Sequence, residues 1–265
     1  MKTSRFSLRT VAMVAVLVWP MQGAHAVDSV VPPGDEVAGY SQRQLAEQWW
    51  QWVLHIPAAT SPLTDTTGEF AGTDNTGPVF FVAGNTGGSS TRSFEVPAGK
   101  PIFFPVVNGV DVEVPGSTSV ADAFACCLGF VDTAANLHAT LDGNNLLVRP
   151  NDQTNPSRQT STEFFTVDVP VDNPFGWTAP YVGMLDTVSD GFWVALDGLS
   201  PGKHTLKFGG KFAAKGQRPG IIGPITVHIT AAAPAISQAQ CLKDGWKALG
   251  FKNQGQCVQF ANTGQ

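Results

Sequence analysis

The chain has 265 residues, of which only 14% are charged, and its 16 Lys and Arg against 21 Asp and Glu give a formal net charge of −5. This acidic balance argues against nucleic-acid binding, because neutralising phosphates needs clustered Lys and Arg. The 28 Gly and 19 Pro favour strands and turns over long surface helices, and the length allows one substantial core.

Residues 1–26 have the pattern of a secretory signal peptide. Three basic residues precede a short apolar run at 11–19, and Ala24-His25-Ala26 forms a small-x-small cleavage site. The run is too short for a membrane span, and no later segment has the ~20 apolar residues that a span needs. We expect a secreted, periplasmic or extracellular protein without a transmembrane segment, whose 13 basic and 21 acidic residues give a net charge of −8. A retained N-terminal anchor is the alternative.

One amphipathic helix is predicted near the start of the mature chain, in SQRQLAEQWWQWVLHIP (41–57). Ser41 and Gln44 match a capping box, and Pro57 ends the helix. One apolar stripe predicts packing against a sheet, and it consists of Leu45, Trp49, Trp52, Val53 and Ile56. Trp50 lies off the centre of this stripe, so we expect it to be partly exposed.

From Gly77 onward the sequence predicts eight to ten short strands. Segments rich in aromatic and β-branched residues are separated by Gly, Pro, Asn and Asp, and they lie at 78–84, 91–96, 101–107, 164–169, 192–196, 204–208 and 223–230. The Asp-Gly pair in HATLDGNNLLV (138–148) predicts a hairpin. The pattern indicates a mainly β protein, in which residues 27–230 form the helix and an antiparallel β-sandwich or jelly roll.

The four cysteines predict a disulfide, because cysteines of exported proteins tend to be oxidised. Cys126 and Cys127 are adjacent, and a bridge between neighbours is strained because their Cα atoms lie only about 3.8 Å apart. We therefore expect Cys241 and Cys257 to close a small C-terminal unit, residues 241–265, after a linker at 231–240. In the loop-entropy model this closure is worth on the order of 3 kcal/mol.

The C-terminal unit combines aromatic and basic residues. GWKALGFKNQGQC (245–257) resembles a short C-terminal motif of secreted bacterial proteins of uncharacterised function. The W-x-x-W helix, VPAGKPIFFP and DGFWVALDGLSPGKHTLKF resemble the central part of such proteins. The resemblance implies no activity, and no functional residue is carried over. Trp246 and Phe251 either pack against the protein or present a basic and aromatic patch to a glycan, an anionic polymer or a partner.

Enzyme signatures such as G-x-S-x-G, H-E-x-x-H and the P-loop are absent. In NGVDVEV (108–114), Asp111 and Glu113 lie on one face if the segment is extended, with Asn108 at the start of the strand. We regard these three residues as a candidate metal site, because Ca²⁺ prefers such oxygen ligands. The carboxylates could also serve in acid/base chemistry.

A rigid aromatic loop is the candidate ligand site. Trp177 and Tyr181 lie in NPFGWTAPY (173–181), where two prolines restrict the backbone, and Asp186 and Asp190 follow. Such a loop suits stacking on a sugar ring while the carboxylates bind its hydroxyls. The alternative is a Trp177 ring that folds back over the edge of the sheet.

Together these patterns predict an exported, non-catalytic binding module for a glycan or cell-wall ligand, with Ca²⁺ as a possible cofactor. Two alternatives remain open. One is a secreted hydrolase whose carboxylates converge only in the fold, and the other is a structural protein of the cell envelope.

Overall fold

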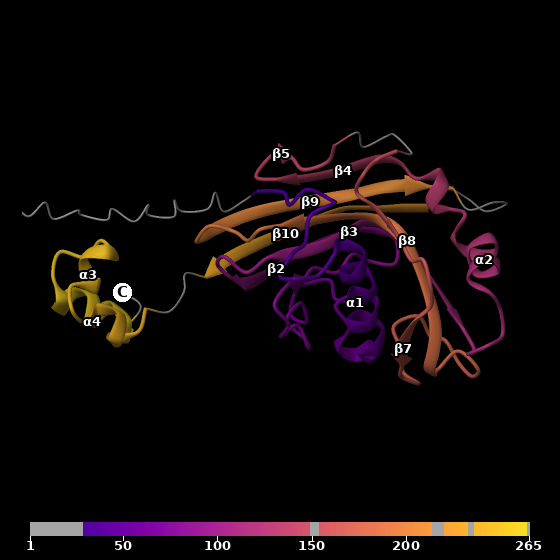
Figure 1. Cartoon of the computed structure of the whole chain (residues 1–265), viewed down its shortest axis with the longest axis horizontal. Helices are drawn as coiled ribbons and strands as arrows, with labels where there is room; N and C mark the ends of the chain where they lie inside the picture. The colour runs from indigo at the N-terminus through magenta and orange to yellow at the C-terminus, as the bar shows by residue number, and fades with distance from the viewer. Residues whose placement is uncertain (1–28, 149–153, 214–219, 233–235, 264–265) are drawn as a thin grey trace, which may run out of the picture.

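The computed structural model describes residues 29–148, 154–213, 220–232 and 236–263 (Figure 1). The chain is mainly β, and its described part contains ten strands in two five-stranded sheets. The predicted signal peptide lies outside the described residues. Within the described part, no helix is long and apolar enough to cross a membrane.

The first sheet has the strand order β1-β3-β8-β6, and β7 also pairs with β8. Its strands are β1 (Phe80–Phe81), β3 (Ile102–Glu113), β6 (Arg158–Thr160), β7 (Phe165–Val169) and β8 (Gly183–Leu196). The second sheet has the order β2-β10-β9-β4-β5. Its strands are β2 (Gly88–Pro97), β4 (Ala135–Leu141), β5 (Asn144–Asn145), β9 (Gly202–Phe212) and β10 (Gly220–Ala232).

Both sheets are mixed. β1 pairs with β3 in parallel, and β2 pairs with β10 in parallel, whereas the other pairs are antiparallel. A purely antiparallel arrangement is therefore wrong for these two pairs. The predicted hairpin is confirmed, since β4 and β5 pair across Asp142 and Gly143, which have φ values of 51° and 85°.

One hydrophobic core receives side chains from both sheets. It includes Phe104 of β3 and Phe208 of β9, whose ring centroids lie 4.9 Å apart, and Val227 of β10. These residues are buried because apolar side chains alternate along each strand. The assignment of the two sheets to a sandwich or jelly roll stays a prediction.

Helix α1 (Gln42–His55) covers the other face of the first sheet, as Figure 1 shows. The predicted capping box is present, since the Ser41 hydroxyl accepts a hydrogen bond from the Gln44 amide and Gln44 Oε1 accepts one from the Ser41 amide, at 3.3 and 2.9 Å. Trp49 packs against Trp193 of β8 with 5.5 Å between ring centroids. Packing of the helix stripe on the sheet is thus confirmed.

Short helical elements complete the fold. η1 (Ala58–Thr60) follows α1, and three elements join β3 to β4, namely α2 (Val120–Ala123), η2 (Phe124–Leu128) and η3 (Val131–Thr133). The side chains of Cys126 and Cys127 in η2 lie outside the described residues. After β10 come η4 (Gln238–Cys241), α3 (Gly245–Ala248) and α4 (Gln254–Thr263), which lie apart from the sheets in Figure 1. The division into a main domain, a linker and a C-terminal unit stays a prediction.

Candidate ligand-binding cavity

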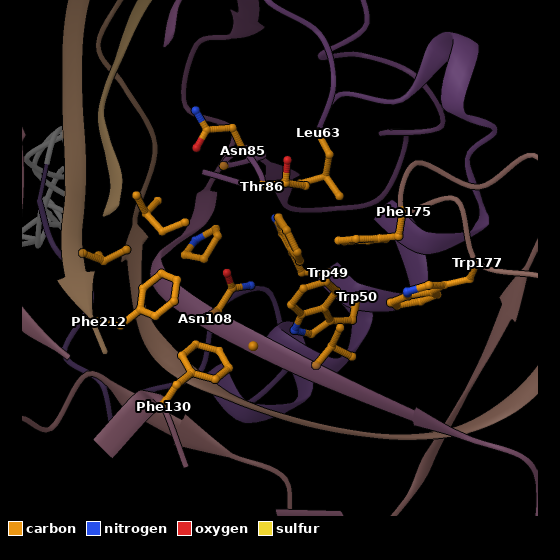
Figure 2. A pocket seen from close by; sticks show the side chains of 16 residues that line it. Trp49, Trp50, Leu63, Asn85, Thr86, Asn108, Phe130, Phe175, Trp177 and Phe212 are labelled. Carbon is orange, nitrogen blue, oxygen red and sulfur yellow. The ribbon is translucent and has the colours of Figure 1, made fainter. Parts of the chain in front are cut away.

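A cavity of about 210 Å³ opens beside α1, where both sheets and three loops meet. Its walls are mainly aromatic (Figure 2), and the rings are Trp49, Trp50, Phe130, Phe175, Trp177 and Phe212. Phe130 and Phe212 lie against each other with ring centroids 5.0 Å apart. The site is thus built from segments that are distant in the sequence.

Helix α1 supplies two adjacent tryptophans in different states. Their rings are perpendicular, with centroids 4.9 Å apart. The indole nitrogen of Trp49 donates to the carbonyl of Val82 at 3.1 Å, whereas Trp50 Nε1 is buried and has no hydrogen-bond partner among the described residues. Trp50 is only 5% exposed, so the expected partial exposure is wrong. The ring lines the cavity instead.

Strand β3 places Asn108 in the cavity. The pairing of β3 with β8 shifts by one residue between Pro105 and Val107, and Asn108 then pairs with Gly191. A Cβ at Gly191 would lie 2.6 Å from the Cβ of Asn108, so only glycine leaves room for Asn108 there. Asn108 Nδ2 is buried without a hydrogen-bond partner in the described part of the chain.

The loop between β1 and β2 contributes Asn85. Its Nδ2 donates to the carbonyl of Gly88 at 3.2 Å, while its Oδ1 is buried and accepts no hydrogen bond from any described residue. Arg92 holds the same loop from below, because its Nη1 donates to the carbonyls of Ala83 and Gly84 at 2.8 and 2.9 Å. Burial lowers the pKa of Arg92, and the nearby charge of Asp65 opposes this.

Asn173 shapes the aromatic loop between β7 and β8. Its Oδ1 accepts hydrogen bonds from the amides of Phe175 and Trp177 at 3.1 and 3.0 Å, and its Nδ2 donates to the carbonyls of Pro170 and Trp177 at 3.0 and 2.8 Å. The two rings are stacked, with centroids 4.6 Å apart and an interplanar angle of 13°. Asn173 is therefore the residue that positions this wall of the cavity.

Phe130 reaches the opposite wall because Gly109 has no side chain. A Cβ at Gly109 would lie 2.4 Å from Phe130 Cζ and 3.0 Å from Leu128 Cδ2. Phe130 thus packs directly on the backbone of β3. The cavity depends on this close approach as well as on its aromatic rings.

No known family model matches the chain, and no curated protein sequence is similar to it. One solved structure aligns with it, described as the solution structure of amebosin. The alignment covers 55% of this chain and 96% of that chain, with 12% identity and a TM-score of 0.13. This likeness is too weak to support any statement on fold or function.

Of the residues predicted to bind a ligand, only Trp177 lines the cavity. Tyr181 is 45% exposed and lies outside it. Asp190 is buried, and its carboxylate accepts hydrogen bonds from Arg158 Nε at 3.0 Å and from Thr160 Oγ1 at 2.8 Å. Asp186 lies opposite Glu113 on the neighbouring strand. The four residues are therefore not brought together in one pocket.

The predicted metal ligands are divided between two faces of β3. Asp111 and Glu113 lie on one face, whereas Asn108 shares the other face with Val110 and Val112, which pack in the cluster around α1. Burial raises the pKa of Asp111 to about 6, and the charge of Glu113 and a hydrogen bond to it act in the same direction. Among the described residues, no group of three or more His, Cys, Asp or Glu could hold a metal ion. A Ca²⁺ site stays a prediction that only the carboxylate pair supports.

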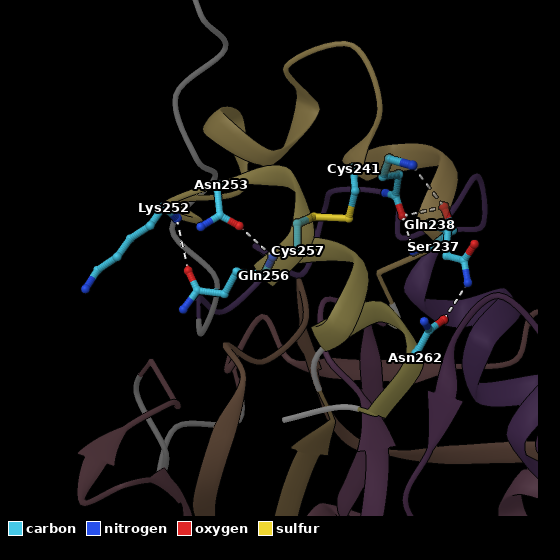
Figure 3. Close-up of a disulfide and its surroundings, with 9 residues drawn as sticks. Ser237, Gln238, Cys241, Lys252, Asn253, Gln256, Cys257 and Asn262 are labelled. Atoms are coloured by element: carbon cyan, nitrogen blue, oxygen red, sulfur yellow. Dashed lines mark hydrogen bonds between the residues drawn. A yellow bond between two sulfur atoms is a disulfide. The ribbon is translucent and has the colours of Figure 1, made fainter.

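The predicted disulfide between Cys241 and Cys257 is present, with 5.7 Å between the Cα atoms (Figure 3). Around it, Asn253 Oδ1 accepts a hydrogen bond from the amide of Gln256 at 2.8 Å. Phe251 packs against Phe260 with ring centroids 5.4 Å apart. The aromatic residues of this unit thus partly pack on one another.

Sequence reasoning missed most of the cavity. Asn85, Phe130 and Phe212 lie in three separate segments, and none belongs to a motif. The one available signal was the glycine at 109 within an otherwise apolar strand, because an isolated glycine in a strand often marks a close approach.

Proposed function

We propose that the protein is a binding protein that holds a small, ring-bearing molecule in the aromatic cavity. The main support is the set of three buried polar atoms without a partner, on Trp50, Asn85 and Asn108, within one cavity of the described chain. An unsatisfied buried donor or acceptor costs about 1–3 kcal/mol, and buried polar atoms are nearly always bonded in folded proteins. A ligand that bonds to these atoms removes this cost, which strengthens its binding.

The size of the cavity supports a ligand with one ring. An apolar cavity of about 150 Å³ accepts benzene, so a cavity of about 210 Å³ has room for one ring with small substituents. Offset or edge-to-face contacts with the aromatic walls add about 0.5–1.5 kcal/mol each beyond the burial of apolar area. The walls therefore favour a planar ligand.

We further propose that this binding protein is exported. The N-terminal sequence has the signal-peptide pattern, and the Cys241–Cys257 disulfide is compatible with an oxidising compartment. The protein would then meet its ligand in the periplasm or outside the cell.

The predicted glycan or cell-wall molecule is the second candidate ligand. Trp177 lines the cavity and Tyr181 is exposed in the same loop, so a sugar ring stacked on Trp177 would contact this loop. The hydrolase alternative has less support, because no carboxylate is among the described residues that line the cavity. A structural envelope protein would have no need of unsatisfied polar atoms in a cavity.

A binding screen of residues 27–265 tests the proposal. Calorimetry with one-ring aromatic compounds, monosaccharides and cell-wall fragments identifies the class that binds. We expect one-ring compounds to bind and Trp177→Ala to weaken them at least about tenfold, as truncation of a central aromatic contact does.

Trp246→Ala is the matched control, because Trp246 lies in the C-terminal unit and outside the cavity. Equal losses in both variants, or no binding by any compound, would contradict the proposal. Binding by sugars alone, lost in Trp177→Ala, would select the glycan instead.

A further inference from the structure

The polar atoms of the cavity define the ligand more closely, and this step rests on the proposed binding function. We infer that the ligand is an uncharged ring that carries a hydrogen-bond acceptor at one end, such as a carbonyl oxygen, and an O–H or N–H donor at the other. The acceptor end faces Trp50 and Asn108, and the donor end faces Asn85.

The walls argue for an uncharged ligand. The described residues that line the cavity include no Asp, Glu, His, Lys or Arg. A charged ligand would lose its hydration there without gaining an opposite charge, which is strongly unfavourable. The buried cation below the β1–β2 loop, Arg92, donates Nη1 to two carbonyls of its own chain and is not among the lining residues.

The acceptor is required by Trp50 and Asn108. An indole N–H can only donate a hydrogen bond, and Trp50 Nε1 is buried without a described partner. Its ring is held at 88° to that of Trp49, which itself is tied to the carbonyl of Val82. The Asn108 Nδ2 group is a second donor that lacks a partner in the described chain. A carbonyl oxygen has two lone pairs, so one oxygen can accept from both donors.

The donor is required by Asn85. Because its Nδ2 donates to the carbonyl of Gly88, the orientation of the amide is set, and Oδ1 is the atom left buried without a described partner. Figure 2 shows Asn85 at one end of the cavity and Trp50 and Asn108 toward the other. A ring with substituents at opposite positions matches this separation.

Five one-ring probes separate the contributions. The probes are para-hydroxyacetophenone (acceptor and donor), acetophenone (acceptor only), para-ethylphenol (donor only), ethylbenzene (neither) and para-hydroxybenzoate (charged). We expect para-hydroxyacetophenone to bind most tightly, about 5- to 10-fold more tightly than either compound with one polar group, since a net hydrogen bond corresponds to about that factor. Ethylbenzene should bind weaker still, and para-hydroxybenzoate at least about tenfold weaker than para-hydroxyacetophenone.

Trp50→Phe removes the indole N–H while keeping an aromatic ring. In this variant, the affinity ratio of acetophenone to ethylbenzene should fall about fivefold, while the affinity for ethylbenzene stays close to that of the unmodified protein. The ethylbenzene measurement thus reports whether the variant still folds and retains the cavity.

The outcomes separate this inference from the proposed function. If ethylbenzene binds as tightly as the ketones, or if para-hydroxybenzoate binds most tightly, the inference on polar groups and charge is wrong, whereas the ring-binding function stands. If none of the five probes binds, both are wrong. An unchanged acetophenone to ethylbenzene ratio in Trp50→Phe would remove Trp50 as the donor.

Discussion

Replacing Asp111 by asparagine should stabilise the protein near neutral pH. The carboxylate lies on β3 beside Glu113, and its Oδ2 is buried without a hydrogen-bond partner among the described residues. Its pKa is raised from 3.8 to about 6, first by burial and then by the charge of Glu113 and a hydrogen bond to it. Asparagine keeps the shape of the side chain and removes the ionisable group.

The sign of the pH dependence follows from the raised pKa. The folded protein holds the Asp111 proton more tightly than the unfolded chain does, so the free energy of unfolding falls as the pH rises from about 4 to about 6 and then levels off. A shift from 3.8 to about 6 would correspond to about 3 kcal/mol at 1.36 kcal/mol per pH unit. Because the side chain retains contact with solvent, screening reduces this, and we expect about 1 kcal/mol.

Urea unfolding of the unmodified protein and Asp111→Asn between pH 4 and pH 8 measures the effect. The variant should be more stable by about 1 kcal/mol at pH 7 and should lose this advantage at pH 4, where both side chains are uncharged. Asp168→Asn, at an exposed position of β7, controls for the change in net charge. A difference between Asp111→Asn and the unmodified protein that does not vary with pH would refute the reasoning.

Three further changes test other parts of the structure. Cys241→Ser should destabilise the C-terminal unit by about 3 kcal/mol in the loop-entropy model, so limited proteolysis should cleave this unit and leave the sheets intact; cleavage throughout the chain would contradict a separate unit. Gly109→Ala should displace the ring of Phe130, which would lie 2.4 Å from the new Cβ, and calorimetry should show weaker probe binding than in Gly129→Ala, where the new Cβ has no neighbour within 4 Å. Asn173→Ala should loosen the stacked rings of the β7–β8 loop, with a change in tryptophan fluorescence and at least about tenfold weaker probe binding; unchanged binding would show that the loop is held in another way.

Local signals in the sequence predicted much of the fold. The capping box and apolar stripe defined α1, and alternating apolar residues defined most strands, because these patterns involve neighbours in the chain. The parallel pairing of β2 with β10 joins residues 88–97 to residues 220–232. No local pattern encodes such a pairing, so the mixed sheets could not be predicted.

The cavity was predicted only through Trp177. Trp50 was expected to be partly exposed because the helix was assumed to have one covered side, whereas the cavity walls also enclose its flank. Asn108 was grouped with Asp111 as a metal ligand, although the two are three residues apart. Since side chains alternate along a strand, this odd spacing alone would have separated them.

A crystal of residues 27–265 soaked with para-bromoacetophenone tests the central claim most directly, because the anomalous signal of bromine locates the ring without ambiguity. The account predicts one strong bromine peak in the cavity between Phe130 and Trp177, with the ketone oxygen directed toward Trp50. A bromine peak elsewhere on the protein with the cavity empty would contradict the assignment of this cavity as the ligand site.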